Sequence, residues 1–192
     1  IVSIPGAPTD LLISEYVEGT SNNKYIEIYN GTGSEINLAN YILRLYANGG
    51  GSITNSGALT GTLSSGSVSV YKNSSAALGL PSGVTAVSNN ACNYNGNDAI
   101  VLYRSDTNSD IDIFGNTSVN PGTAWTSDGG YSTENKTLRR KSSVSQGVTT
   151  NPTSGFPTLG TEWDMFNTDV VSGLGSHSTY TSGYTQVVST GS

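Results

Sequence analysis

Short runs of alternating apolar and polar residues recur along the chain and predict a protein made mainly of β-strands. The first two runs are 11–17 and 25–30, and the first of them places Glu15 on the same face as Leu11 and Ile13. Alternation with a period of two is typical of a strand that buries one face. The polar loop between the runs either turns the chain back into a hairpin or carries it to a facing sheet.

Later segments continue this pattern. The run 99–103 is the most apolar and predicts a central strand, with 111–114 as its hairpin partner. The basic residues of 137–141 predict an edge strand, because charges discourage a further strand from pairing. Residues 74–81 are expected to form a helical turn that ends at Pro81. The other expected strands are 41–46, 67–71, 85–88 and 162–166.

The number of short strands and the length of 192 residues predict a single all-β domain, with a β-sandwich as its architecture. We expect residues 10–178 to form this sandwich. Residues 1–9 are expected to be an N-terminal arm, since Pro5 and Pro8 cannot donate hydrogen bonds to a β-ladder. Residues 179–192 are expected to be a tail or an added strand.

The opening strands also resemble a known family. The sequence DLLISEYVEG at 10–19, followed by SNNK at 21–24 and IEIYN at 26–30, resembles the start of bacterial lamin tail domains. Weaker similarities follow in the same order at 41–46, 95–99, 111–115, 137–141, 162–164 and 174–177. The resemblance implies an immunoglobulin-like β-sandwich that serves as a non-catalytic module of secreted or surface-attached bacterial proteins. Some of those proteins carry nucleases or phosphatases on the same chain.

Composition and charge narrow the choice of partners. Charged residues make up 11% of the chain, against about 25% in an average soluble protein, which is typical of exported all-β proteins. The formal net charge of −6 repels a phosphate backbone, so nucleic acid is not expected as a partner. The one basic cluster, Lys136 with 139–141, is expected to be a solvated strand end. No apolar run approaches the roughly 20 residues of a membrane span.

No arrangement of residues predicts catalysis, and we expect no enzymatic activity. His177 is the only histidine and lies in a glycine- and serine-rich turn, while the single cysteine, Cys92, has no histidine near it in sequence. Both are expected to be structural. Glu15 and Glu27 could in principle form a glycosidase-type acid pair, but the sequence does not set their separation.

Calcium is the expected cofactor if there is one, and the first candidate site is the segment 106–112. Asp106, Asn108, Asp110 and Asp112 place oxygen atoms at alternate positions, as at the start of a calcium loop. The segment lacks the glycine and the final glutamate of an EF-hand. A turn between two strands explains the same residues through Asp and Asn turn chemistry.

A second oxygen-rich set is more scattered in sequence. A carboxylate such as that of Glu15, near the edge of the core, needs a cation, Lys24 or backbone donors. Pairing within the protein is the favoured explanation, and calcium is the alternative. The members of the set are Glu15, Glu18, Glu27, Asn30 and Asp98.

Aromatic side chains offer another mode of ligand binding. The chain has eleven tyrosines and three phenylalanines, and a tyrosine ring suits half-wet contacts with sugars or proteins. Trp125, in a long loop, and Tyr25 and Tyr29, on one strand face, are the predicted ligand contacts. The alternative is that the tyrosines pack one face of the sandwich. Trp163 is expected in the core.

These observations predict an extracellular or cell-surface module for adhesion, scaffolding or ligand binding, stabilised by calcium if a metal binds. Its expected partner is a protein or polysaccharide at a cell surface, or another copy of itself. One alternative is a structural subunit that polymerises by strand addition through residues 1–10 or 184–189. A lesser alternative is an accessory domain of a secreted nuclease or other hydrolase.

Overall fold

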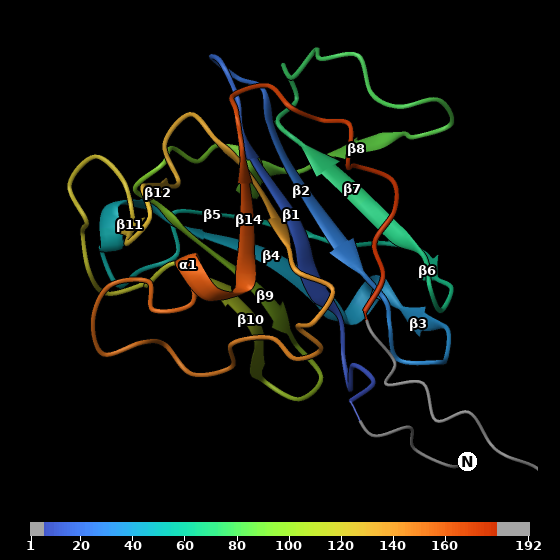
Figure 1. Ribbon diagram of the computed structural model, residues 1–192. Helices are drawn as coiled ribbons and strands as arrows, with labels where there is room; N and C mark the ends of the chain where they lie inside the picture. The colour runs from blue at the N-terminus through green and yellow to red at the C-terminus, as the bar shows by residue number, and fades with distance from the viewer. Residues whose placement is uncertain (1–5, 180–192) are drawn as a thin grey trace, which may run out of the picture.

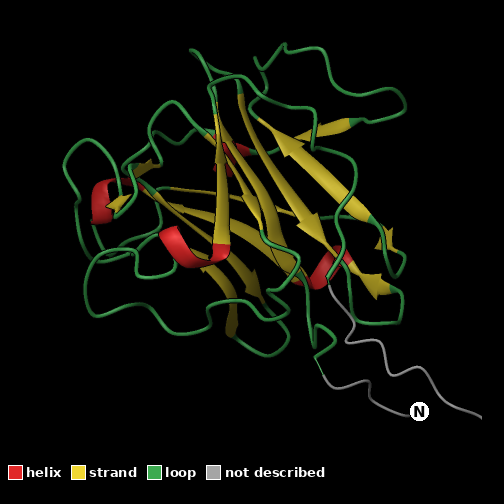
Figure 2. Ribbon diagram, viewed as in Figure 1, coloured by secondary structure: helices red, strands yellow, loops and turns green. Residues whose placement is uncertain are grey.

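β-Strands are the main regular secondary structure of residues 6–179, which the computed structural model describes (Figures 1 and 2). The front layer in Figure 1 is a six-stranded sheet with the order β14-β13-β1-β2-β7-β8. All neighbours in it are antiparallel except β7 and β8. Its strands are β1 (Leu12–Glu18), β2 (Lys24–Tyr29), β7 (Val68–Lys72), β8 (Ala86–Ser88), β13 (Thr137–Arg140) and β14 (Trp163–Phe166).

A four-stranded antiparallel sheet with the order β10-β9-β4-β5 lies behind it (Figure 1). Its strands are β4 (Tyr41–Tyr46), β5 (Asn55–Ala58), β9 (Ala99–Arg104) and β10 (Ser109–Phe114). Two small sheets pair β3 (Ile36–Asn37) with β6 (Thr62–Leu63), and β11 (Thr126–Ser127) with β12 (Tyr131–Ser132). The helices are short: η1 (Leu38–Asn40), η2 (Ala47–Gly49), η3 (Asn90–Cys92) and α1 (Leu159–Glu162).

The core between the two layers is centred on aromatic rings. The ring of Tyr16, which is fully buried, stacks on Phe114 at 4.2 Å and on Tyr94 at 4.8 Å between centroids. Trp163 meets the Phe114 ring edge-on at 5.2 Å. The Tyr94 hydroxyl donates to the carbonyl oxygen of Val17 at 2.9 Å, which satisfies a polar atom inside the core. These contacts join the inner faces of the two sheets and confirm the predicted β-sandwich.

The sequence pattern located most of the larger strands correctly. The structure confirms strands in all nine segments that the alternation identified, from β1 and β2 to β14. β1 and β2 pair directly, so the loop between them closes a hairpin. β9 lies between β4 and β10, which confirms its prediction as a central strand with β10 as its hairpin partner.

The prediction that β13 is an edge strand is wrong. β13 lies between β1 and β14, because its two arginines are neutralised on opposite sides of the strand. Arg139 pairs with Glu15 and Arg140 pairs with Asp112. The basic cluster is therefore not a solvated strand end.

The predicted helical turn at 74–81 is also wrong, since this segment is irregular. Backbone N–H groups of residues 74–81 donate hydrogen bonds to side chains of the β1–β2 hairpin. The N–H of Ala77 donates to Asn23 Oδ1 at 3.0 Å, and the N–H of Leu78 donates to the Tyr25 hydroxyl at 3.0 Å. These bonds replace the helical ones.

Glu15 does not share a face with Leu11 and Ile13, contrary to the simple alternation. A β-bulge between Ile13 and Glu15 shifts the register of β1 against β2. Ile13 and Tyr16 both face the core as a result, and Glu15 lies opposite Glu27. The bulge thus moves a carboxylate from the core to the outer face of the six-stranded sheet.

Most of the predicted terminal arms lie outside the described residues, which exclude 1–5 and 180–192. Of the N-terminal arm, residues 6–9 are described. The Thr9 hydroxyl donates to Gln146 Oε1 at 2.8 Å. Among the described residues, no helix is long and apolar enough to cross a membrane.

Candidate functional site

A polar groove of about 580 Å³ opens where three segments distant in sequence meet. The N-terminal segment 9–11 forms one wall, the start of β10 at 108–111 forms the second, and residues 146–149 form the third. Hydroxyl, amide and carboxylate groups of these segments line it. The lining residues are Thr9, Asp10, Leu11, Asn108, Ser109, Asp110, Ile111, Gln146, Gly147 and Thr149. We call this the β10 groove.

Hydrogen bonds and an ion pair fix the N-terminal wall of the β10 groove. The Asp10 carboxylate accepts hydrogen bonds from the Leu11 N–H at 2.7 Å and from the Tyr41 hydroxyl at 2.6 Å. It also pairs with Arg104 at 3.1 Å. The Gln146 side chain donates to the Ala7 carbonyl at 3.2 Å. These contacts hold the wall in place, so the groove exists before any ligand arrives.

The second wall begins in the tight turn between β9 and β10. Asn108 adopts a left-handed backbone conformation, φ 52°, which Asn tolerates better than most residues. The Tyr103 hydroxyl donates to Asn108 Oδ1 and fixes this side chain. The Arg44 guanidinium lies over the Tyr103 ring at 3.2 Å from its centroid. The groove therefore borders a tyrosine–arginine stack on the outer face of the four-stranded sheet.

Asp110 is the carboxylate of the β10 groove that is free to meet a ligand. It makes no hydrogen bond and no ion pair within residues 6–179, unlike Asp10. Partial burial raises the pKa of Asp110, and the charge of Arg44 partly opposes this rise. A half-buried carboxylate without a partner gains most when a donor such as a sugar hydroxyl reaches it.

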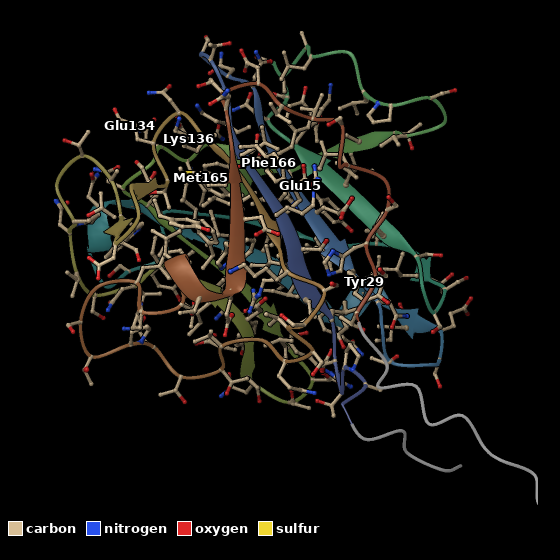
Figure 3. All side chains as sticks on the ribbon, in the orientation of Figure 1. Glu15, Tyr29, Glu134, Lys136, Met165 and Phe166 are labelled. Carbon is tan, nitrogen blue, oxygen red and sulfur yellow. The ribbon has the colours of Figure 1, made fainter. Side chains whose placement is uncertain are left out.

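A second group of polar side chains lies on the outer face of the six-stranded sheet. Glu15 and Glu27 are paired directly across β1 and β2, and both are buried. Arg139 Nε donates to Glu15 Oε2 at 2.8 Å. The Ser14 hydroxyl donates to Glu27 Oε1 at 2.7 Å, and the Gly175 N–H donates to Glu27 Oε2 at 2.6 Å. Figure 3 labels Glu15 on this sheet.

Desolvation dominates the acid–base behaviour of this pair. Burial raises the pKa of Glu15, and the hydrogen bond and charge of Arg139 partly oppose this. Burial also raises the pKa of Glu27 to about 7, although its hydrogen bonds from Ser14 and Gly175 favour the ionised form. Near neutral pH the pair therefore carries less than its full charge of two.

A third group is a buried ion pair that connects the two sheets. Arg140, from β13, donates through Nη1 to Asp112 Oδ2 of β10 at 2.9 Å, and both side chains are almost fully buried. Asp112 also accepts the N–H groups of Ile13 and Val148, each at 2.9 Å. Glu162 lies 2.9 Å from Arg140 Nη2. Every oxygen of Asp112 is thus used for holding the fold.

The structure separates the predicted metal ligands rather than gathering them. Lys24 pairs with Glu18 at 2.5 Å and Arg104 pairs with Asp106 at 2.8 Å. Asp98 accepts the N–H groups of Asn48 and Asn95, each at 2.8 Å, while Asn30 closes its own turn. Within the part of the chain described, no three His, Cys, Asp or Glu residues are placed to share a metal ion.

Internal pairing is confirmed for the second oxygen-rich set, Glu15, Glu18, Glu27, Asn30 and Asp98, with one change of partner. Glu15 pairs with Arg139, where the sequence offered Lys24. Of the segment 106–112, Asn108 and Asp110 reach the β10 groove while Asp112 points between the sheets. The binding of calcium stays a prediction from the sequence.

The three aromatic residues predicted to touch a ligand are all buried, so this prediction is wrong. Trp125 is 3% exposed, and its indole N–H donates to the Asp98 carbonyl at 3.4 Å. Tyr25 packs on Val17 and Val70, and Tyr29 contacts the ring of His177 edge-on at 4.9 Å. The large apolar area of these rings outweighs the polarity of the residues beside them in sequence. Trp163 is in the core, as predicted.

His177 and Cys92 both have structural surroundings. Burial and the charges of Arg140 and Arg139 lower the pKa of His177 to about 4. Burial raises the pKa of the Cys92 thiol far above its ordinary range, so no reactive thiolate forms near neutral pH. Gln146, which lines the β10 groove, and Arg44 and Tyr103, which border it, were not among the predicted site residues. No local sequence motif identifies these three residues, because they are far apart in the sequence and only the fold brings them together.

Comparison with known families identifies the first part of the chain. The family model described as the lamin tail domain matches residues 5–118, which is more than half of the 192 residues. This part contains β1 to β10, including the whole four-stranded sheet. β13 and β14 follow it in sequence. Comparisons with curated proteins and with solved structures give no significant match.

Proposed function

The chain belongs to the lamin tail domain family, and from this premise we propose that it is a non-catalytic, extracellular recognition module that binds a cell-surface polysaccharide in the β10 groove. One observation carries the proposal. The half-buried Asp110 carboxylate has no protein partner in residues 6–179 and lies in a preformed groove lined by hydroxyl and amide groups.

The chemistry of the β10 groove supports a hydroxyl-rich ligand. Side-chain amides, such as those of Asn108 and Gln146, donate and accept at once, and a carboxylate accepts two or more hydrogen bonds. Vicinal sugar hydroxyls offer matching donors and acceptors. More of the groove lining is polar than apolar, whereas pockets for drug-like ligands are mostly apolar.

Several other ionisable groups are held in ion pairs within the protein, which supports a role as a non-catalytic module. Asp112 and Arg140 hold the sheets together, and Glu18 is held by Lys24. A general acid or base must be able to reach a substrate, and these groups are committed to structural contacts. The low charged fraction of 11% supports an extracellular location.

Affinity electrophoresis tests the proposal directly. The full chain is run through native gels that contain dextran, xylan, galactomannan or alginate, and we expect at least one of them to retard it. The substitution Asp110→Asn keeps the shape of the side chain and is expected to weaken this association about 10-fold, because a charge-assisted hydrogen bond is lost.

Asp128→Asn is the matched control, because it makes the same change in net charge at an exposed position outside the groove. It should leave the retardation unchanged. Equal weakening by both substitutions would place binding elsewhere, and migration that is unaffected by all four polymers would contradict the polysaccharide assignment and favour a protein partner.

A further inference from the structure

A strap made of residues 167–178 follows β14 and crosses the outer face of the six-stranded sheet (Figure 1). At its start the Asp169 carboxylate accepts hydrogen bonds from the N–H and the hydroxyl of Thr20, each at 2.8 Å. Next to Asp169, the Val170 carbonyl accepts from the Thr137 hydroxyl at 2.8 Å. The strap therefore closes over the sheet through a few discrete side-chain contacts, and it adds no strand.

The second half of the strap lies over a small apolar cluster and over the carboxylate pair. Leu174 is 2% exposed and packs with Val17, Tyr25 and Val70. Next to it, the Gly175 N–H donates to Glu27. Opening of this half would bring water to Glu27 and to His177, and both side chains would then recover their ordinary affinity for protons.

We propose that the strap opens and closes independently of the sandwich, and that it closes most tightly when Glu27 is protonated and His177 is neutral. These two proton equilibria act in opposite directions as pH changes. The strap is thus held closed to a similar degree through the acidic and neutral range, and loss of either group would turn it into a pH-dependent switch.

The contacts of Glu27 explain why the closed strap favours its neutral form. Glu15 faces it from β1, and Arg139 on β13 supplies the nearest positive charge, which is already paired with Glu15. On the other side β7 contributes Val70, which has no charge. A second buried negative charge is therefore poorly compensated. A neutral Glu27 can keep both hydrogen bonds, since its protonated oxygen can donate to Ser14.

The contacts of His177 explain why the closed strap favours a neutral imidazole. Its ring lies edge-on against Tyr29, and Arg139 and Arg140 act on it with like charge. Asp164, which lines the same cavity of about 500 Å³, is the nearby acid on β14. Nε2 of the His177 ring is buried and has no hydrogen-bond partner among residues 6–179. A proton added to this ring would therefore be buried without an acceptor.

The two effects are of similar size and opposite sign. The pKa of Glu27 is raised from 4.5 to about 7 when the strap is closed, so ionisation of Glu27 weakens closure as pH rises through this range. The pKa of His177 is lowered from 6.5 to about 4, so protonation of His177 weakens closure as pH falls through its range. Between about pH 4.5 and about pH 7.5, either effect alone changes the equilibrium constant for closing the strap roughly 100-fold. Because the two effects oppose each other, together they change it by only about 3-fold.

Hydrogen exchange of the full chain, followed by mass spectrometry, tests this inference. Protection of peptides from the strap is compared with that of peptides from β9, after correction for intrinsic exchange rates. Between about pH 4.5 and about pH 7.5 the unaltered chain should change its strap protection by only about 3-fold. Glu27→Gln should lose about 50- to 100-fold of this protection as pH falls. His177→Gln should lose about 100-fold as pH rises.

The double variant, with both substitutions, should again show a flat profile. Single variants with the pH profile of the unaltered chain would overturn the inference, as would strap amides that exchange only together with β9. Should a variant fail to fold, the ring resonances of His177, the only histidine, decide the matter in the unaltered chain. A transition near about pH 4 supports the inference, and one near about pH 6.5 would overturn it.

Discussion

Replacement of Asp112 by alanine is expected to lower the free energy of unfolding by about 4 kcal/mol. The substitution would leave the Arg140 guanidinium, whose side chain is 1% exposed, without its main counter-charge. It would also orphan the N–H groups of Ile13 and Val148, and each unsatisfied buried donor adds a further cost. Urea unfolding followed by circular dichroism measures the difference.

A double substitution separates the loss of a charge partner from the loss of the pair itself. Asp112→Leu with Arg140→Met removes both charges and fills similar volume, so we expect it to recover the part of the lost stability that comes from the unpaired Arg140 charge. The part that comes from the orphaned N–H groups of Ile13 and Val148 should remain. Arg104→Met, at a partly exposed ion pair, is the matched control and should cost about 1 kcal/mol or less. An Asp112→Ala cost as small as that of the control would contradict the role assigned to the buried pair.

Ending the chain after residue 118, where the family match stops, is expected to abolish cooperative folding. The shortened chain lacks β13 and β14, which cover one side of β1. It also lacks Arg140, which neutralises Asp112, and Trp163, which packs against Phe114. The lost burial and the unpaired charge together exceed the stability of an ordinary domain of about 5–15 kcal/mol.

A chain that ends after residue 179 is the control for this truncation. It keeps every described strand and should unfold in one cooperative transition, as measured by near-ultraviolet circular dichroism in urea. A cooperative transition of the 118-residue chain with comparable stability would show that the later strands are an addition to a complete sandwich, contrary to the topology seen here.

Much of the fold could be predicted from the sequence because hydrophobic periodicity is a local signal. The alternating runs around Ile26 and Ile100 identify strands whose apolar side chains meet in one core. The fate of β13 could not be predicted in this way. Its arginines are neutralised by Glu15 and Asp112, and Arg139 lies 124 positions from its partner, so only the folded chain shows that a charged strand can be central.

The face occupied by Glu15 depends on a feature with no local signature. The β-bulge next to it is set by the pairing of β1 with β2, and a shift of one residue moves every later side chain to the other face. This shift places Glu15 opposite Glu27, and the strap then covers both. The sequence could therefore identify Glu15 and Glu27 as candidate acids, but it could not predict that their side chains lie next to each other.

The candidate site was the least predictable part. Asn108 and Asp110 were singled out for their oxygen atoms and do line the β10 groove. The groove itself exists because 9–11 and 146–149 come together there, and no periodicity connects those segments. The prediction that Trp125 contacts a ligand was wrong because a loop rich in small polar residues predicts an exposed side chain. In the structure the Trp125 ring packs beside Phe156 in the core.

The central claim, that this family member recognises its ligand through the β10 groove, is tested most directly by NMR. Amide resonances of the uniformly ¹⁵N-labelled full chain are followed while the polysaccharide that retards it in gels, or soluble xylan fragments, is added. We predict saturable shifts that are concentrated at residues 9–11, 108–111 and 146–149. Shifts confined to the strap, or an unchanged spectrum at saturating concentrations of every polymer tested, would contradict the account.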